Sequence, residues 1–150
     1  MKKTATYLTI AVLYIVVTTG TVQAHCQVPC GIYDDQMRIH MMEEHVTTIE
    51  KAMKQIKADE NENQTVRWIM NKEKHADELT EIVTYYFMAQ RIKPDADQYA
   101  EKLQALHQIM IYSMKSKQTI DEANVAKLKE LIHEFEHLYF GEEAHEHTHE

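Results

Sequence analysis

The densest group of metal-ligand side chains lies in the stretch HCQVPCGIY (25–33), which we call the hook and which contains both cysteines of the chain. If the chain is cut before His25, this histidine presents a free α-amine and an imidazole. Cys26 adds an amide nitrogen and a thiolate, and Cys30 adds a second thiolate. The amine and the amide belong to adjacent residues, so they form a five-membered chelate that the first thiolate extends. The result is an N₂S₂ plane with an axial imidazole, a geometry typical of Ni(II) or Cu(II), whereas zinc favours tetrahedral sites.

This ligand set favours redox chemistry. Thiolates and a deprotonated amide donate strongly and stabilise the higher oxidation state of a metal ion, and the imidazole can bind the oxidised ion and leave the reduced one. The hook therefore predicts one-electron exchange with small oxygen species, provided that the amine of His25 is released. A Cys26–Cys30 disulfide is the alternative in an oxidising compartment. Such a bond closes a very short loop and constrains little of the unfolded chain, which favours the ligand interpretation.

Residues 1–24 have the pattern of a secretory signal peptide. Lys2 and Lys3 precede the apolar run ATYLTIAVLYIVV, and Val22 and Ala24 are the small residues expected before a cleavage site. The alternative is a single membrane span, but the apolar run falls short of the roughly twenty residues that a span needs. We therefore expect cleavage after Ala24, export to the periplasm or the exterior, and no membrane attachment afterwards.

Size and charge limit the possible partners. Cleavage of 24 residues from 150 leaves 126, enough for one domain with its own core. Taking the two leader lysines from the formal net charge of −8 leaves −10 for the remainder. A charge of this sign argues against nucleic acid or an anionic membrane as a partner. An anionic substrate would need local cations, and Lys72 and Lys74 are candidates to line its approach.

Four amphipathic helices are expected over residues 34–140, because apolar residues recur there at three- and four-residue steps. They run from Asp34 or Asp35 to Lys57, from Gln64 to Ile92, from Asp95 to Lys115, and from a capping box at 119–122 to Phe140. The buried stripe of the second helix is expected to be Val66, Ile69, Ala76, Leu79, Val83, Tyr86 and Phe87. Short loops between the helices predict an all-α, antiparallel four-helix bundle with the metal-binding hook at its N-terminus. Residues 141–150 are expected to form a flexible tail rich in His and Glu.

The hook, His25-Cys26-Gln27-Val28-Pro29-Cys30-Gly31-Ile32-Tyr33, resembles the H-C-x-x-P-C-G-x-Y nickel hook of nickel-containing superoxide dismutases. The resemblance implies one nickel ion per subunit, bound by the amine and axial imidazole of His25, the amide and thiolate of Cys26 and the thiolate of Cys30. It implies that Pro29 shapes the turn and that Tyr33 gates small anions at the open face. It also implies a right-handed four-helix bundle, a homohexamer, and conversion of superoxide to O₂ and H₂O₂ with nickel alternating between Ni(II) and Ni(III).

Two histidines outside the hook, His40 and His75, occupy positions where some family members have other residues. Those members have a carboxylate where His40 falls and an arginine near His75, and these groups orient the axial imidazole. The resemblance makes His40 and His75 candidates for that role, and ordinary solvent-facing histidines are the alternative. The leader is another departure, because many family members are intracellular and are trimmed by a dedicated protease.

Two further patterns offer rival interpretations. His133-Glu134-Phe135-Glu136-His137 matches H-E-x-x-H, which places two histidines on one helical face as in zinc proteases. A protease also needs a third ligand and a substrate cleft, and Phe140 and Glu143 stand where the metzincin extension requires glycine and histidine. The tail EEAHEHTHE (142–150) either collects metal for the hook or is a solvated end.

Two functional hypotheses remain. The first is an exported nickel superoxide dismutase. The second is an exported nickel-binding or nickel-delivery protein that uses the same hook and the histidine-rich tail without turnover. The axial imidazole and the gating tyrosine favour the enzyme, because a carrier has no evident use for either.

Overall fold

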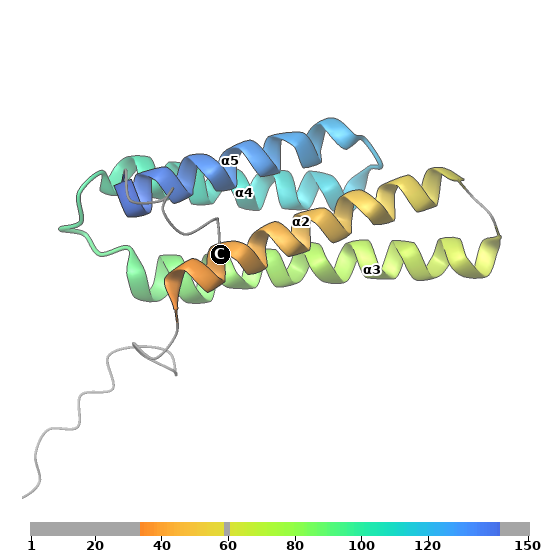
Figure 1. Ribbon diagram of the computed structural model, residues 1–150, viewed down its shortest axis with the longest axis horizontal. Helices are drawn as coiled ribbons and strands as arrows, with labels where there is room; N and C mark the ends of the chain where they lie inside the picture. The colour runs from red at the N-terminus through yellow and green to blue at the C-terminus, as the bar shows by residue number, and fades with distance from the viewer. Residues whose placement is uncertain (1–33, 59–60, 142–150) are drawn as a thin grey trace, which may run out of the picture.

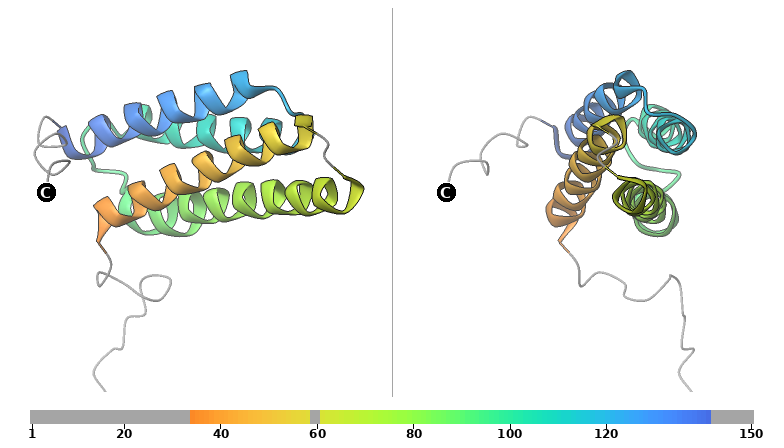
Figure 2. Two further views of the ribbon diagram at one scale, coloured as in Figure 1. Left: turned by 45° about the vertical axis from the view of Figure 1, so that its right-hand side comes forward. Right: turned by 90° about the vertical axis from the view of Figure 1, so that its right-hand side faces the viewer.

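Residues 34–58 and 61–141, which the computed structural model describes, form a bundle of helices (Figure 1). α2 spans Asp35–Ala58, and α3 spans Glu62–Glu81 and continues into the π-helical segment η1, Ile82–Arg91. α4 (Tyr99–Gln118) and α5 (Glu122–Phe140) complete the bundle. α2 packs against α3 and α5, and α4 packs against the same two neighbours, as the end-on view of Figure 2 shows. The predicted antiparallel four-helix bundle is confirmed, while the leader, the hook and the tail lie outside the described residues.

Side-chain caps fix three of the helix starts. Asp34 accepts hydrogen bonds from the backbone N–H groups of the next turn of α2, and Asn61 accepts one from Gln64 at the start of α3. At the start of α5 the cap is Asp121, whose carboxylate accepts from the N–H of Ala123. Each bond satisfies a donor that has no partner within its own helix.

Two predicted helix starts are wrong. The capping box at 119–122 does not form, because Asp121 lies closer to the helix and takes the capping position, while Thr119 accepts from the N–H of Asp121 instead. The third helix begins at Tyr99 rather than Asp95. Gln98 adopts the left-handed conformation with φ of 51°, and the turn after Pro94 runs up to that residue.

The core lies along the bundle axis and is formed mainly by the predicted apolar stripes, with exceptions on α3 and α4. Met114, expected on the apolar stripe of the third helix, is 51% exposed. Val66 and Ile69, expected in the core, are 54% and 41% exposed. The first turns of α3 project beyond the α4–α5 hairpin, as Figures 1 and 2 show, so no neighbouring hairpin covers them. From Ala76 onward the stripe is buried, with Phe87 and Phe135 in edge-to-face contact at 4.8 Å between ring centroids.

Within the described ranges, every helix is too short or too polar to cross a membrane.

Candidate metal centre

Asp35, the first residue of α2, ties the start of this helix to the ends of two others. Its Oδ2 accepts a hydrogen bond of 2.7 Å from the Tyr139 hydroxyl of α5, and its Oδ1 accepts one from the Tyr86 hydroxyl of η1. The Arg91 guanidinium lies 2.8 Å from the same Oδ1 and donates to the Tyr86 hydroxyl. Burial raises the pKa of Tyr139, and so does its bond to Asp35. Because Asp35 follows Tyr33 by two positions, these contacts fix the point where the hook joins the bundle.

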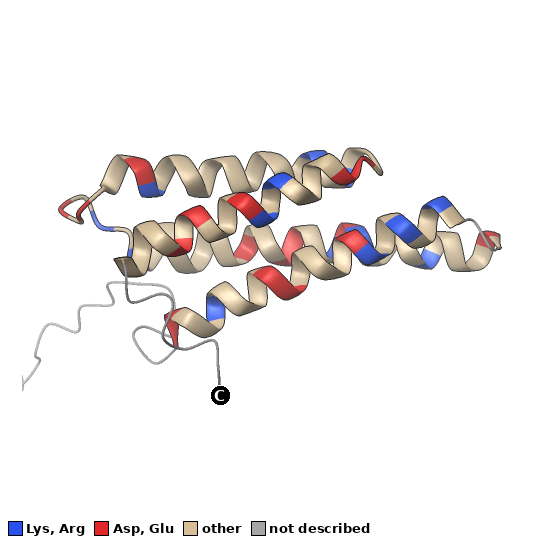
Figure 3. Cartoon of the chain, turned by 45° about the horizontal axis from the view of Figure 1, so that its top comes forward, with Lys and Arg blue, Asp and Glu red and all other residues tan. Residues whose placement is uncertain are grey.

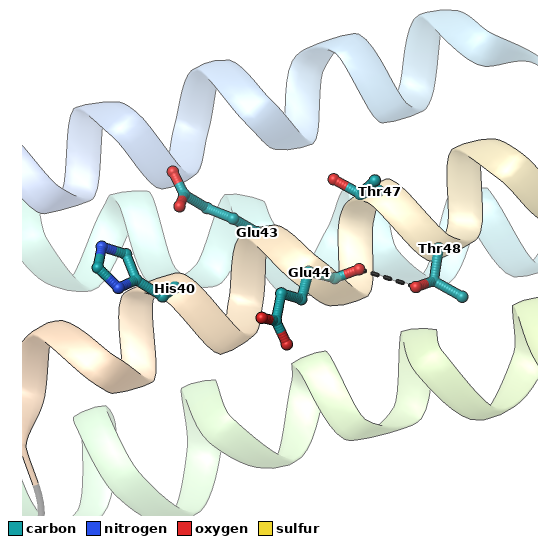
Figure 4. A pocket seen from close by; sticks show the side chains of 5 residues that line it. All are labelled: His40, Glu43, Glu44, Thr47 and Thr48. Atoms are coloured by element: carbon teal, nitrogen blue, oxygen red, sulfur yellow. Dashed lines mark hydrogen bonds between the residues drawn. The ribbon is translucent and has the colours of Figure 1, made fainter. Parts of the chain in front are cut away.

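His40 lies on the exposed surface of α2, five residues beyond Asp35. One of its ring nitrogens is 3.3 Å from the side-chain nitrogen of Gln36, which donates to Glu136 of α5 at 2.7 Å. His40 also lines a shallow depression, shown in Figure 4, together with Glu43, Glu44, Thr47 and Thr48. Glu43 points toward α5, and burial followed by the nearby Glu136 raises the pKa of its carboxyl.

His75 lies in a different place, between α2 and α3. Its Nδ1 is 2.8 Å from the Nδ1 of His45, and both nitrogens are 3.6 Å from Oε2 of Glu78. Burial lowers the pKa of His45, and the adjacent His75 lowers it further. His45, His75 and Glu78 are thus three potential metal ligands whose ligand atoms lie close together in the described part of the chain. His40 and His75 have different partners, so the fold does not bring these two candidates together.

The two lysines considered for the substrate approach are both engaged. Lys72 is buried, and its ammonium donates to the backbone carbonyls of Ser116 and Lys117 at the end of α4. Lys74 is exposed and lies 3.5 Å from Glu78, one turn along α3. The idea that Lys72 faces an incoming anion is therefore wrong, because its charge caps a helix inside the bundle.

Comparison with known proteins covers both the hook and these helices. A family model described as nickel-containing superoxide dismutase matches residues 20–143. The chain belongs to this family. No curated protein and no solved structure matches it.

Membership of the nickel-containing superoxide dismutase family implies a nickel cofactor and superoxide as substrate. The hook residues His25, Cys26 and Cys30, with Pro29 and Tyr33, lie outside the described residues, so their ligand roles stay predictions. Their donor chemistry would fit nickel once the chain is cut before His25, since the set would then combine an amine, an amide nitrogen, an imidazole and two thiolates.

The H-E-x-x-H pattern gains no support as a protease site in this family member. His133 and His137 lie on one face of α5 with ring centroids 4.5 Å apart, as their spacing predicts. Within 34–58 and 61–141, however, neither belongs to a group of three converging ligands. Phe135, between them, points into the core and is fully buried, which is a structural use of the helix.

Proposed function

We propose that this chain is an exported nickel superoxide dismutase, which converts two superoxide anions and two protons to O₂ and H₂O₂. The observation that carries the proposal is the hook sequence HCQVPCGIY, which falls inside the range matched by the family model. The position of the hook directly before α2, whose first residue is bonded to η1 and α5, supports it.

The residues of the hook have separate roles in this proposal. His25 would hold one nickel ion per chain through its amine and its imidazole, Cys26 through its amide nitrogen and thiolate, and Cys30 through the second thiolate. When bound, nickel supplies a one-electron couple between Ni(II) and Ni(III), which serves both halves of the dismutation. Pro29 shapes the turn between the thiolates, and Tyr33 restricts the open face to small anions.

Cleavage after Ala24 is part of the proposed mechanism. Until the chain is cut, the nitrogen of His25 is a peptide amide, which would have to lose its proton before it could bind a metal ion, whereas the free amine donates its lone pair as a neutral ligand. The leader pattern of residues 1–24 directs the protein to the periplasm or the exterior, where the same cut releases the amine. Export and activation are thus a single event.

The proposed assembly is a homohexamer, as the resemblance to the family implies. Val66, Ile69 and Met70 share one face of α3 and are 54%, 41% and 66% exposed. A contiguous exposed apolar face of this kind is typical of a surface that binds another protein. It supports self-association through the projecting turns of α3.

The test uses nickel-loaded protein that begins at His25. Cys26→Ser removes one thiolate and should abolish superoxide dismutation, while the matched variant Gln27→Ser, which changes the next residue and no proposed ligand, should retain it. Metal content is measured on the same samples. A wild-type protein that binds nickel and does not consume superoxide would indicate the delivery protein instead.

A further inference from the structure

His45, His75 and Glu78 form a compact triangle of ligand atoms outside the hook. The two Nδ1 atoms are 2.8 Å apart, and each is 3.6 Å from Oε2 of Glu78. A point equidistant from these three atoms lies about 2.0 Å from each, which matches Zn–N and Zn–O bonds of roughly 2.0–2.2 Å. The three side chains therefore converge on a centre at the bonding distance of a first-row divalent ion.

The helices hold this triangle in place. His75 and Glu78 are three residues apart on α3 and so point the same way, and His45 faces them from α2. The two helices lie side by side along this stretch (Figure 1). Ligands that project from packed helices keep their positions better than ligands on loops, so little rearrangement is needed to receive an ion.

The surroundings suit a cation with an open coordination position. The second oxygen of Glu78 faces Lys74 at 3.5 Å, which orients the carboxylate and leaves Oε2 toward the imidazoles. The side chains of His45, His75 and Glu78 are 13%, 23% and 35% exposed, so water can reach the centre. Three protein ligands and one solvent position are the pattern of zinc sites that keep an open coordination position.

A hydrogen bond between the two imidazoles is a simpler use of the same residues. It needs one proton between the nitrogens and explains their 2.8 Å separation. It leaves the Glu78 oxygen at 3.6 Å from both rings, too far for a hydrogen bond to either. One ion at the centre satisfies all three atoms at once.

We propose that His45, His75 and Glu78 are a second metal site, separate from the hook, for a divalent first-row transition ion such as Zn²⁺. The site joins α2 to α3, and its nitrogen and carboxylate donors differ from the sulfur-rich donors of the hook. It does not depend on the redox function of the hook. An ion bound there acts on the bundle itself.

The experiment uses the full chain, in which the competing metal ligands of the hook and of the tail are substituted. This background carries Cys26→Ser and Cys30→Ser, with alanine in place of the histidines at 25, 145, 147 and 149. Titration with Zn²⁺ alone should show one ion bound per chain and a higher midpoint of thermal unfolding. Co²⁺ in the same background should give the visible absorption of a low-symmetry site.

Variants of the triangle decide the result. His75→Ala or His75→Gln should weaken Zn²⁺ binding at least about 100-fold, as expected for the loss of a ligand rather than of a neighbouring group, and Glu78→Gln should also weaken it. Helical circular dichroism checks that each variant folds. His107→Ala, an exposed control on α4, should change nothing. The proposal is overturned if the background binds no Zn²⁺, if His75→Gln and Glu78→Gln bind it as the background does, or if only His133→Ala with His137→Ala removes it.

Discussion

A single carboxylate connects the start of α2 to the ends of η1 and α5. Asp35 accepts hydrogen bonds from Tyr86 and Tyr139 and pairs with Arg91, so it joins three helical elements at one point. Arg38 also lies over the Tyr86 ring, with 5.1 Å from its guanidinium carbon to the ring centroid. The hook ends at Tyr33, two residues before Asp35 in the sequence.

Replacement of Tyr139 by phenylalanine tests this anchor. The variant loses a hydrogen bond to a charged group, and we expect the free energy of unfolding to fall by about 1.5–3 kcal/mol. The matched control is Tyr85→Phe, because Tyr85 is 56% exposed and its loss of a hydroxyl should cost little. Urea denaturation measures both. Equal stability of the two variants would mean that the Tyr139–Asp35 bond does not hold the helix start.

The Tyr139–Asp35 pair makes the free energy of unfolding depend on pH. The pKa of Tyr139 is raised in the folded chain, first by burial and then by the bond to Asp35, so the folded state holds the phenolic proton more tightly than the unfolded state. Its contribution is complete below the unfolded pKa of about 10 and is lost as the pH rises above that value. The stability difference between wild type and Tyr139→Phe should therefore begin to shrink near pH 10 and shrink further as the pH rises toward the raised pKa of the folded state.

At this scale the sequence predicts local patterns and misses contacts between distant segments. The hook is readable because its ligands lie within nine consecutive residues. Asp35 is bonded to Tyr86 and Tyr139, which lie 51 and 104 positions further along the chain. The residues next to Asp35 in the sequence do not predict these bonds. The sequence does not predict His45 as a ligand for the same reason. A lone histidine on α2 becomes a candidate ligand only when the fold places His75 of α3 beside it.

At the scale of the helices, a side chain of α3 caps the C-terminal end of α4. The last carbonyls of a helix have no partner within it, and the buried ammonium of Lys72 supplies one for Ser116 and Lys117. A positive charge is also favoured at this end of a helix. The periodicity of α3 predicts the helix correctly, and it cannot reveal that a lysine on its buried face has this partner.

Lys72→Met should therefore destabilise the bundle although it makes the side chain apolar. The two carbonyls lose their charged donor, and we expect the free energy of unfolding to fall by about 2–3 kcal/mol. Lys74→Met is the matched control, because its exposed pair with Glu78 is worth no more than about 0.5 kcal/mol. A Lys72→Met variant as stable as wild type would show that the helix end needs no such cap.

Across the whole molecule, charge and apolar surface are unevenly placed. Lysines gather on α2 and α5 toward the end remote from Asp35, and Figure 3 shows them beside acidic residues. Several of them are paired with carboxylates, as in the contacts of Lys57 with Glu122 and Lys129 with Glu50, each at 2.6 Å. Arg38 and Arg91 lie at the other end of the bundle, where both guanidinium groups are over the Tyr86 ring and Arg91 also pairs with Asp35.

The projecting face of α3 gives a test of assembly. Ile69→Glu places a charge among Val66 and Met70, and we expect it to break the proposed hexamer into smaller species, because burying an unpaired charge is costly. Met114→Glu changes another exposed apolar residue, on α4, and should leave the assembly intact. Sedimentation or light scattering gives the mass of each. A hexamer that persists in Ile69→Glu would place the interface elsewhere.

The most direct measurement compares superoxide consumption by two nickel-treated forms of the protein, one beginning at His25 and one retaining Ala24 before it. The forms differ by one residue, which converts the amine of His25 into an amide. The proposed role of the His25 amine predicts rapid, catalytic loss of superoxide with the first form and loss of that activity with the second. Equal rates from the two forms, or no activity from the form beginning at His25, would contradict it.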